Sequence, residues 1–335
     1  MVVGTARCAV TAPAERAEHA RYNVQPHRLR RWTRRGQRWQ RQEQHFNVFN
    51  VTVLETIKKS AGFLAKRDVE SPRLQAELLL AHVLKVPRMK LYLNFERVLS
   101  EPETETMRQF VKRRGQREPL QHITGSTSFC GFEIAVDRRA LVPRPETEIL
   151  AELGWTFFST LGPEQTALDF GTGTGCLAVA LAAKCPNARI TAIDASADAL
   201  VLAGQNAQTN NVAARIEFFH GNGFAALPDG AQFALIISNP PYIPTAEIET
   251  LEPEVRDFDP RPALDGGADG LDFYRMLAAQ AGTLLRPGGK LMLEFGDGQA
   301  PAVQKLFENE NWIVEAVKDD YSQRARILIA TWKVS

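Results

Sequence analysis

The chain has 335 residues, 44% hydrophobic and 24% charged, a balance typical of a globular protein with room for two domains. Its formal net charge is +1, and no apolar run approaches the roughly 20 residues that a membrane-spanning helix requires. Four cysteines without a Cys-x-x-Cys pair and six histidines without metal-ligand spacing argue against a zinc site, a disulfide framework and a histidine base. We therefore expect a cytoplasmic protein without a metal ion, and favour a mitochondrial location less.

Residues 1–50 differ in composition from the rest of the chain. They hold ten Arg, no Lys and three acids, a net charge of +7, so the remaining residues carry −6. A mitochondrial transit peptide would be Arg-rich but usually contains Ser, which this stretch lacks. A basic nucleic-acid arm is the second interpretation. The sequence favours the third, a disordered extension ahead of a true start near Val51 or Val53, and the acidic remainder makes nucleic acid an unfavoured partner.

Residues 51–118 are predicted to form a helical domain. Apolar residues recur at helical spacing from Val53 to Leu64. Ser71-Pro72 predicts an N-cap followed by proline at the first helical position. Ser100 and Glu103 have the spacing of a capping box that opens another helix. A helical unit ahead of a catalytic domain suits recognition of a partner.

Residues 119–142 are predicted to form a β-hairpin linker, and residues 143–335 a doubly wound α/β domain. Pro143–Glu148 begins this domain and opens a helix. The last two strands are expected to pair as an antiparallel hairpin at the sheet edge. The predicted strands are Ala167–Phe170, Arg189–Ile193, Arg215–Phe219, Phe233–Ser238, Lys290–Phe295, Ile313–Val317 and Ile327–Thr331.

The tetrapeptide Asn239-Pro240-Pro241-Tyr242 directly follows the apolar run Phe233–Ser238, so it lies at the carboxyl end of a buried strand. The prolines have a restricted φ and no N–H, which holds the backbone carbonyls in a defined direction. Two rigid acceptors at a strand end suit the NH2 of a planar amide or an amino-substituted base. Tyr242 is expected to cover the flat face of that group.

A glycine loop, Gly171-Thr172-Gly173-Thr174-Gly175, follows the first strand and opens a helix, with Asp169 just before it. Asp194 ends the second strand, where an acid commonly binds ribose hydroxyls. A dinucleotide prefers Gly-x-Gly-x-x-Gly, with the helix N-terminus receiving a pyrophosphate. The Gly-x-Gly-x-Gly spacing and the neighbouring acid favour a positively charged cofactor, S-adenosylmethionine, over NAD.

Together these motifs resemble the HemK/PrmC family of protein-glutamine methyltransferases, over residues from about 53 to 335. Pro143–Glu148, Leu293–Gly296 and Asp319–Tyr321 are similar to further segments of that family. The resemblance implies a Rossmann-like, S-adenosylmethionine-dependent methyltransferase domain over residues 143–335. It also implies, as substrate, the glutamine of the Gly-Gly-Gln motif of class I peptide chain release factors. A branch acting on a ribosomal protein is similar, but the Pro143–Glu148 run fits the release-factor branch better.

The site residues follow from the motifs and the resemblance together. Asn239, Pro240 and Tyr242 are the expected catalytic residues, and Pro241 joins them in binding substrate. The Asn239 side-chain oxygen and the Pro240 carbonyl are expected to accept the two amide N–H bonds. The expected cofactor-binding residues are Asp169, Gly171, Thr172, Gly173, Thr174, Gly175, Asp194, Asn222, Gly223, Phe224 and Asn239.

The chain departs from the family where the adenine is expected. Family members often have an acid at the position of Asn222 and an aromatic residue at that of Gly223. Asn222 retains the ability to bind an amino group, and Phe224 is a candidate for the missing surface.

Three other functions stay open at this point. A DNA adenine-N6 methyltransferase would use the same donor geometry but usually carries a basic target-reading region. An enzyme that methylates an exocyclic amine in RNA is related to it. A cofactor-binding scaffold without activity is the non-enzyme alternative, which the intact Asn239–Tyr242 segment disfavours.

Overall fold

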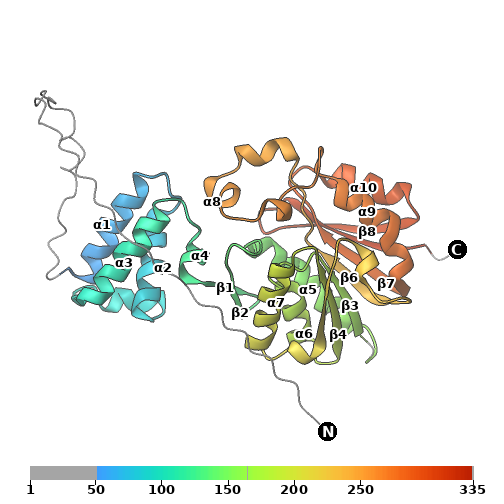
Figure 1. The fold of residues 1–335 in the computed structure, drawn as a ribbon, viewed down its shortest axis with the longest axis horizontal. Helices are drawn as coiled ribbons and strands as arrows, with labels where there is room; N and C mark the ends of the chain where they lie inside the picture. The colour runs from blue at the N-terminus through green and yellow to red at the C-terminus, as the bar shows by residue number, and fades with distance from the viewer. Residues whose placement is uncertain (1–50, 164, 334–335) are drawn as a thin grey trace, which may run out of the picture. The chain divides into compact units, whose positions relative to one another are not determined.

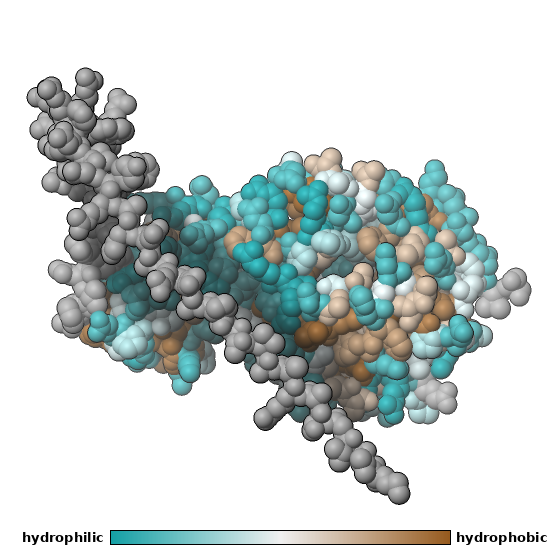
Figure 2. Space-filling model, in the orientation of Figure 1, coloured by the Kyte–Doolittle hydropathy of each residue, from teal (hydrophilic) through white to brown (hydrophobic). Residues whose placement is uncertain are grey.

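The computed structural model describes residues 51–163 and 165–333 (Figure 1). The Arg-rich stretch 1–50, with its three interpretations, lies outside the described residues. Figure 2 shows hydrophilic residues over much of the visible face, with smaller groups of hydrophobic residues between them. No helix of the described residues is long and apolar enough to cross a membrane.

The first part of the described chain is helical, as predicted. Its core is built from apolar residues of successive helices, including Leu64, Leu79 and Met107. Glu103 accepts the Ser100 backbone N–H at 2.8 Å, as the predicted capping box requires. Ser71 differs from the prediction, because its backbone is left-handed (φ 46°) and its side chain makes no capping bond. The helices are α1 (Val53–Ala65), α2 (Pro72–Leu84), the 3-10 helix η1 (Arg88–Leu93), α3 (Glu101–Arg114) and α4 (Leu120–Thr124).

A short antiparallel hairpin follows, formed by β1 (Ser126–Phe129) and β2 (Phe132–Ala135). It is shorter than the predicted 119–142 segment, because α4 occupies the first of those residues. Both turn residues have positive φ, 52° at Cys130 and 84° at Gly131, as a two-residue hairpin turn with the right twist requires. The Cys130 N–H donates to Glu148 of the next helix, α5 (Pro145–Ser159), which anchors the hairpin.

Residues 165–332 contain a seven-stranded sheet of order β5-β4-β3-β6-β7-β9-β8. Within this sheet β3, β4, β5, β6 and β7 pair in parallel, and β9 pairs antiparallel with both β7 and β8. The predicted α/β sheet and its antiparallel edge hairpin are therefore confirmed. The strands are β3 (Gln165–Phe170), β4 (Ala188–Asp194), β5 (Ile216–His220), β6 (Phe233–Ser238), β7 (Leu285–Glu294), β8 (Trp312–Asp319) and β9 (Ala325–Trp332).

Helices cover both faces of this sheet (Figure 1). Alternate strand residues point to opposite faces. In β6, Leu235 and Ile237 join the core that contains α5 and α6, whereas Ile236 joins the core that contains α9 and α10. The longer helices of this part are α6 (Cys176–Lys184), α7 (Ala197–Thr209), α9 (Asp272–Gln280) and α10 (Ala300–Asn309). The short ones are α8 (Pro253–Arg256), η2 (Ala213–Arg215), η3 (Phe224–Ala226), η4 (Thr245–Thr250), η5 (Arg261–Ala263) and η6 (Ala281–Leu284).

The parallel strands bring distant motifs to one edge of the sheet. β3 lies between β4 and β6, so the segments that follow all three strands are neighbours. The Ser238 hydroxyl donates to the Phe170 carbonyl at 2.7 Å and ties the ends of β6 and β3 together. Binding sites of doubly wound sheets lie at this carboxyl edge, where the strand order reverses direction.

Candidate functional site

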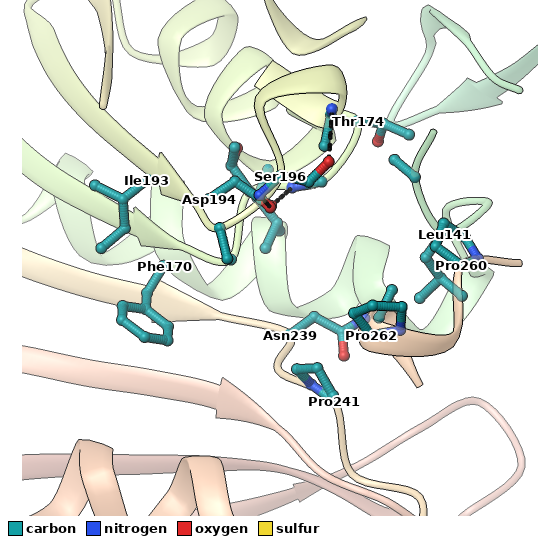
Figure 3. Close-up of a pocket in the computed structure, with 18 of the residues that line it drawn as sticks. Leu141, Phe170, Thr174, Ile193, Asp194, Ser196, Asn239, Pro241, Pro260 and Pro262 are labelled. Atoms are coloured by element: carbon teal, nitrogen blue, oxygen red, sulfur yellow. Dashed lines mark hydrogen bonds between the residues drawn. The ribbon is translucent and has the colours of Figure 1, made fainter. Parts of the chain in front are cut away.

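A cavity of about 420 Å³ opens at the carboxyl edge of the sheet. Figure 3 shows Asp194 and Ser196 on one side and Asn239 and Pro241 on the opposite side. The segments after β3, β4, β5 and β6 all contribute to its wall. The predicted site residues that line it are Gly171, Thr172, Gly173, Thr174, Asp194, Asn222, Gly223, Asn239 and Pro241.

The glycine loop owes its shape to backbone positions that only glycine adopts easily. Gly173 has a φ of 55°, and its N–H donates to Asp194 Oδ2 at 2.8 Å. Gly175 has a φ of 77° and lies against α7, since a Cβ there would stand 2.9 Å from that of Ala203. Gly175 therefore permits close packing as it opens α6, and it does not line the cavity.

Asp194 organises the loop that faces the glycine loop. Its Oδ1 accepts the Ser196 N–H at 2.8 Å, and the Ser196 hydroxyl in turn caps α7 by accepting the Ala199 N–H at 3.2 Å (Figure 3). The two carboxylate oxygens thus hold one backbone N–H each, and each retains a lone pair. A half-buried carboxylate on a cavity wall with spare acceptor capacity suits ribose hydroxyls.

Asp169 lies behind the glycine loop and does not line the cavity. Its Oδ2 accepts from the Thr172 hydroxyl at 2.6 Å and from the Ala178 N–H at 3.1 Å. Complete burial raises the pKa of this carboxyl to about 7. Among the described residues its Oδ1 has no hydrogen-bond partner. Asp169 was expected among the cofactor-binding residues, but its bonds are to Thr172 and Ala178, so it supports the glycine loop from beneath.

Asn222 and Gly223 line the cavity, as expected for the adenine end, but Phe224 does not. Phe224 instead packs on the Phe170 ring, with the ring centroids 4.8 Å apart. Phe170 and Ile193, at the ends of β3 and β4, form the apolar wall there (Figure 3). Phe170 and Ile193, and not Phe224, therefore supply the apolar surface beside Asn222.

Asn239 is held in place from behind by α5. Its side-chain Nδ2 donates to the Thr147 hydroxyl at 3.0 Å. Among the described residues its Oδ1 accepts no hydrogen bond, and Asn239 lines the cavity (Figure 3). Pro240 is buried and does not line the cavity, whereas Pro241 does.

Tyr242, the expected cover for the substrate amide, packs against the core beneath the cavity. Its carbonyl accepts from Gln299 Nε2 at 2.9 Å, and its ring lies where a Gly296 side chain would otherwise stand. Burial and the nearby Glu294 raise the pKa of Tyr242 to about 12. The tyrosine thus anchors the segment after β6 instead of lining the cavity.

Sequence reasoning missed one wall of the cavity, which Leu141, Pro260 and Pro262 form (Figure 3). The segments that carry them are joined by an ion pair between Arg144 and Asp259, 2.7 Å apart. The signal available in the sequence was the repeated Pro-Arg-Pro at 143–145 and 260–262. Thr147, also on the wall, stood inside a motif to which no site role was given.

A second ion-pair cluster links the helical part to the segment after β6. Arg114, almost fully buried, donates to Glu254 Oε1 at 2.8 Å. Arg117 donates to Glu254 and to Glu252, at 2.6 Å in each case. Since Pro260 and Pro262 follow shortly after, this cluster connects α3 and its C-terminal turn to the chain segment that completes the cavity wall.

Two family models match the chain. Residues 55–125 match the PrmC N-terminal domain, and residues 153–251 match the methyltransferase small domain. These matches cover most of the helical part and the strands that carry the cavity. The described residues hold no cluster of His, Cys, Asp and Glu suited to a metal ion.

The chain is similar to curated release factor glutamine methyltransferases. The protein of Geobacter sulfurreducens is 44% identical over 257 residues, 76% of this chain and 88% of that protein. The protein of Chlorobaculum tepidum is 41% identical over 275 residues, covering 80% and 93% of the two chains. A solved structure, the release factor-specific protein-(glutamine-N5) methyltransferase of Alicyclobacillus acidocaldarius, is 28% identical with a TM-score of 0.37, over 58% of this chain and 95% of that one. By its similarity to these curated relatives, the chain belongs to the family of release factor glutamine methyltransferases.

Proposed function

We propose that this protein transfers a methyl group from S-adenosylmethionine to the side-chain amide nitrogen of the glutamine in the Gly-Gly-Gln motif of class I release factors. One observation carries the proposal for the site. Asn239, at the end of β6, lines the same cavity as the glycine loop and Asp194. A cofactor site and an amide-binding side chain therefore share one space.

The cavity fits S-adenosylmethionine by the chemistry of its wall. Asp194 supplies acceptors for ribose hydroxyls, while Phe170, Ile193 and Asn222 would hold the adenine. Gly171 has no atom near the position of a Cβ, so its backbone is open to a ligand. When bound, S-adenosylmethionine supplies a methyl group on a positively charged sulfur that departs as a neutral thioether.

The protein's contribution at the reacting end is positioning. A glutamine amide is a weak nucleophile because its nitrogen lone pair is delocalised into the carbonyl. Asn239 Oδ1, on the cavity wall, would accept one of its N–H bonds and orient that lone pair toward the cofactor, whereas Pro240, expected to supply the second acceptor, is buried and does not line the cavity. The methylated nitrogen releases a proton to solvent, so no strong base is required.

The helical part, residues 51–118 of the predicted domain division, is proposed to recognise the release factor. The helical part is connected to the cavity wall through the ion pairs of Arg114 and Arg117 with Glu254, which supports this role. A release factor bound to the helical part would be linked through these pairs to the segment that forms the wall. Adenine-N6 methylation is less favoured, since the curated relatives that match most of the chain are named for glutamine.

The test is methyl transfer from labelled S-adenosylmethionine to a purified class I release factor, compared with the same factor carrying Gln→Ala in its Gly-Gly-Gln motif. We expect label on the wild-type factor alone. A single-stranded and a duplex DNA substrate are included in the same assay. Label on DNA, or equal label on both release factors, would overturn the proposed substrate.

A further inference from the structure

Three side chains from distant parts of the chain form a hydrogen-bonded relay that runs from Asn239 on the cavity wall to two buried residues, Thr147 and Glu294. Asn239 Nδ2 donates to Thr147 Oγ1 at 3.0 Å, and the Thr147 hydroxyl donates to Glu294 Oε2 at 2.7 Å. Thr147 and Glu294 are each only 2% exposed. They belong to the Pro143–Glu148 and Leu293–Gly296 motifs, and the proposed function gives neither of them a role.

The number of hydrogens on each group fixes which atom donates in each bond of the relay. A threonine hydroxyl has one hydrogen, and an ionised carboxylate only accepts. Thr147 must therefore donate its one hydrogen to Glu294. Its oxygen can then only accept a hydrogen bond, and it accepts from the Asn239 NH2 group. The network assigns the orientation of the Asn239 amide in this way, with the carbonyl oxygen toward the cavity.

Protonation gives Glu294 an O–H donor that the ionised carboxylate lacks, and this donor allows every bond of the relay to reverse. The Glu294 O–H would donate to Thr147, and Thr147 would then donate to the Asn239 carbonyl oxygen. The amide would turn over and present its NH2 to the cavity. Two NH2 groups, one from Asn239 and one from the substrate glutamine, have no acceptor between them, so the substrate would lose its partner.

We propose that Thr147 and Glu294 are positioning residues, and that an ionised Glu294 holds the Asn239 carbonyl toward the substrate amide through Thr147. This inference rests on the proposed function, in which Asn239 accepts from the glutamine amide. It adds a condition to that function. The site can bind the substrate amide only when Glu294, which does not line the cavity, is ionised.

The surroundings of Glu294 place this ionisation within the ordinary working range. Burial, foremost, raises the pKa of Glu294 to about 7, and Glu146 on α5 adds to the rise. The hydrogen bond from Thr147 opposes the rise, as do Arg326 on β9 and Arg144 before α5. Two further titratable neighbours are the phenols of Tyr242 and Tyr274, whose pKa values burial raises. Protonation of Glu294 therefore increases as the pH falls through about 7, and turnover is expected to fall with it.

Two substitutions of Thr147 test the relay. Thr147→Val keeps the shape and removes the hydroxyl, so we expect kcat to fall by about 10- to 100-fold while affinity for S-adenosylmethionine, measured by calorimetry, changes little. Thr147→Ser keeps the hydroxyl and should recover most of the rate. The matched control is Thr56→Val, which removes another buried hydroxyl that donates only to the Thr52 carbonyl in the helical part. The control should cost stability without changing kcat.

Glu294→Gln tests the charge. Glutamine does not titrate, so whichever end of its amide faces Thr147, the loss of activity toward acid pH in the wild type should disappear in this variant. If the role of Glu294 were merely structural, Glu294→Gln would lower the melting temperature and leave the shape of the pH profile of kcat unchanged. That result, or a Thr147→Val enzyme with wild-type kcat, would overturn the relay while wild-type methylation upholds the proposed function. A wild type that methylates no glutamine would overturn both.

Discussion

Arg144 and Asp259 lie 115 positions apart in the sequence, and their side chains meet at 2.7 Å beside the cavity. Asp259 is almost fully buried, and burial raises its pKa while the Arg144 charge opposes the rise. The pair joins the segment before α5 to the segment that carries Pro260 and Pro262. Both segments line the cavity, so the pair fixes two parts of its wall to each other.

Replacing Arg144 by Ala should destabilise the protein and weaken cofactor binding. Asp259 would keep only a long contact, 3.4 Å from the Val142 N–H, and the loss should amount to about 1–3 kcal/mol of unfolding free energy. Urea unfolding and calorimetric titration with S-adenosylmethionine measure the two effects. Arg256→Ala is the control, because its pair with Asp257 is exposed, and it should change neither quantity. An Arg144→Ala variant as stable as the control would contradict the expectation.

Replacing Asn239 by Ala should abolish most turnover and spare the cofactor. The substrate amide would lose its acceptor on the cavity wall, and we expect kcat to fall by at least about 100-fold. Affinity for S-adenosylmethionine should stay within about twofold, since Asp194 and the glycine loop are untouched. Single-turnover methylation of a release factor and calorimetry separate the two. Asn94→Ala, which removes an exposed asparagine bonded to the Lys90 carbonyl, should behave as wild type. A parallel loss of cofactor affinity would reassign Asn239 to the cofactor.

Replacing Asp194 by Ala should have the opposite signature. Its two oxygens hold the Gly173 and Ser196 N–H groups and face the cavity, so affinity for S-adenosylmethionine should fall by about 10- to 100-fold. At saturating cofactor, much of kcat should return. Asp198→Ala provides the control, because that exposed acid lies on the same stretch of chain but does not line the cavity. Unchanged affinity in Asp194→Ala would remove Asp194 from the cofactor site.

Replacing Asp169 by Asn should change how stability depends on pH. The folded-state pKa of Asp169, about 7, lies above its ordinary value of 3.8, so the folded protein binds this proton more tightly. The resulting stabilisation is complete below the unfolded pKa and is lost as the pH rises through about 7. Asparagine does not ionise, so the Asp169→Asn variant lacks this pH dependence. The melting temperature of the variant minus that of the wild type should therefore rise by about 2 °C or more between about pH 5 and 7.5. A difference that stays constant over this range would exclude the predicted ionisation.

Most of the fold was predictable from local patterns. The buried run Phe233–Ser238 and the glycine loop after Phe170 each signalled a strand with a functional segment at its end. These signals are local, because strand pattern and glycine conformation depend on adjacent residues. They predict Asn239 and Asp194 at the carboxyl ends of strands, and in the structure both residues line one cavity.

The sequence by itself determined the α/β class, the strands and the two motifs that face each other across the cavity. Only the tertiary structure decided which side chains reach that cavity. In the structure Asp169, Phe224 and Tyr242 do not line the cavity. Thr147 and Glu294, 147 positions apart in the sequence, form a hydrogen bond. The reason is physical: burial and long-range contacts depend on how strands are ordered and helices packed, and a single sequence does not encode such neighbours in its local pattern.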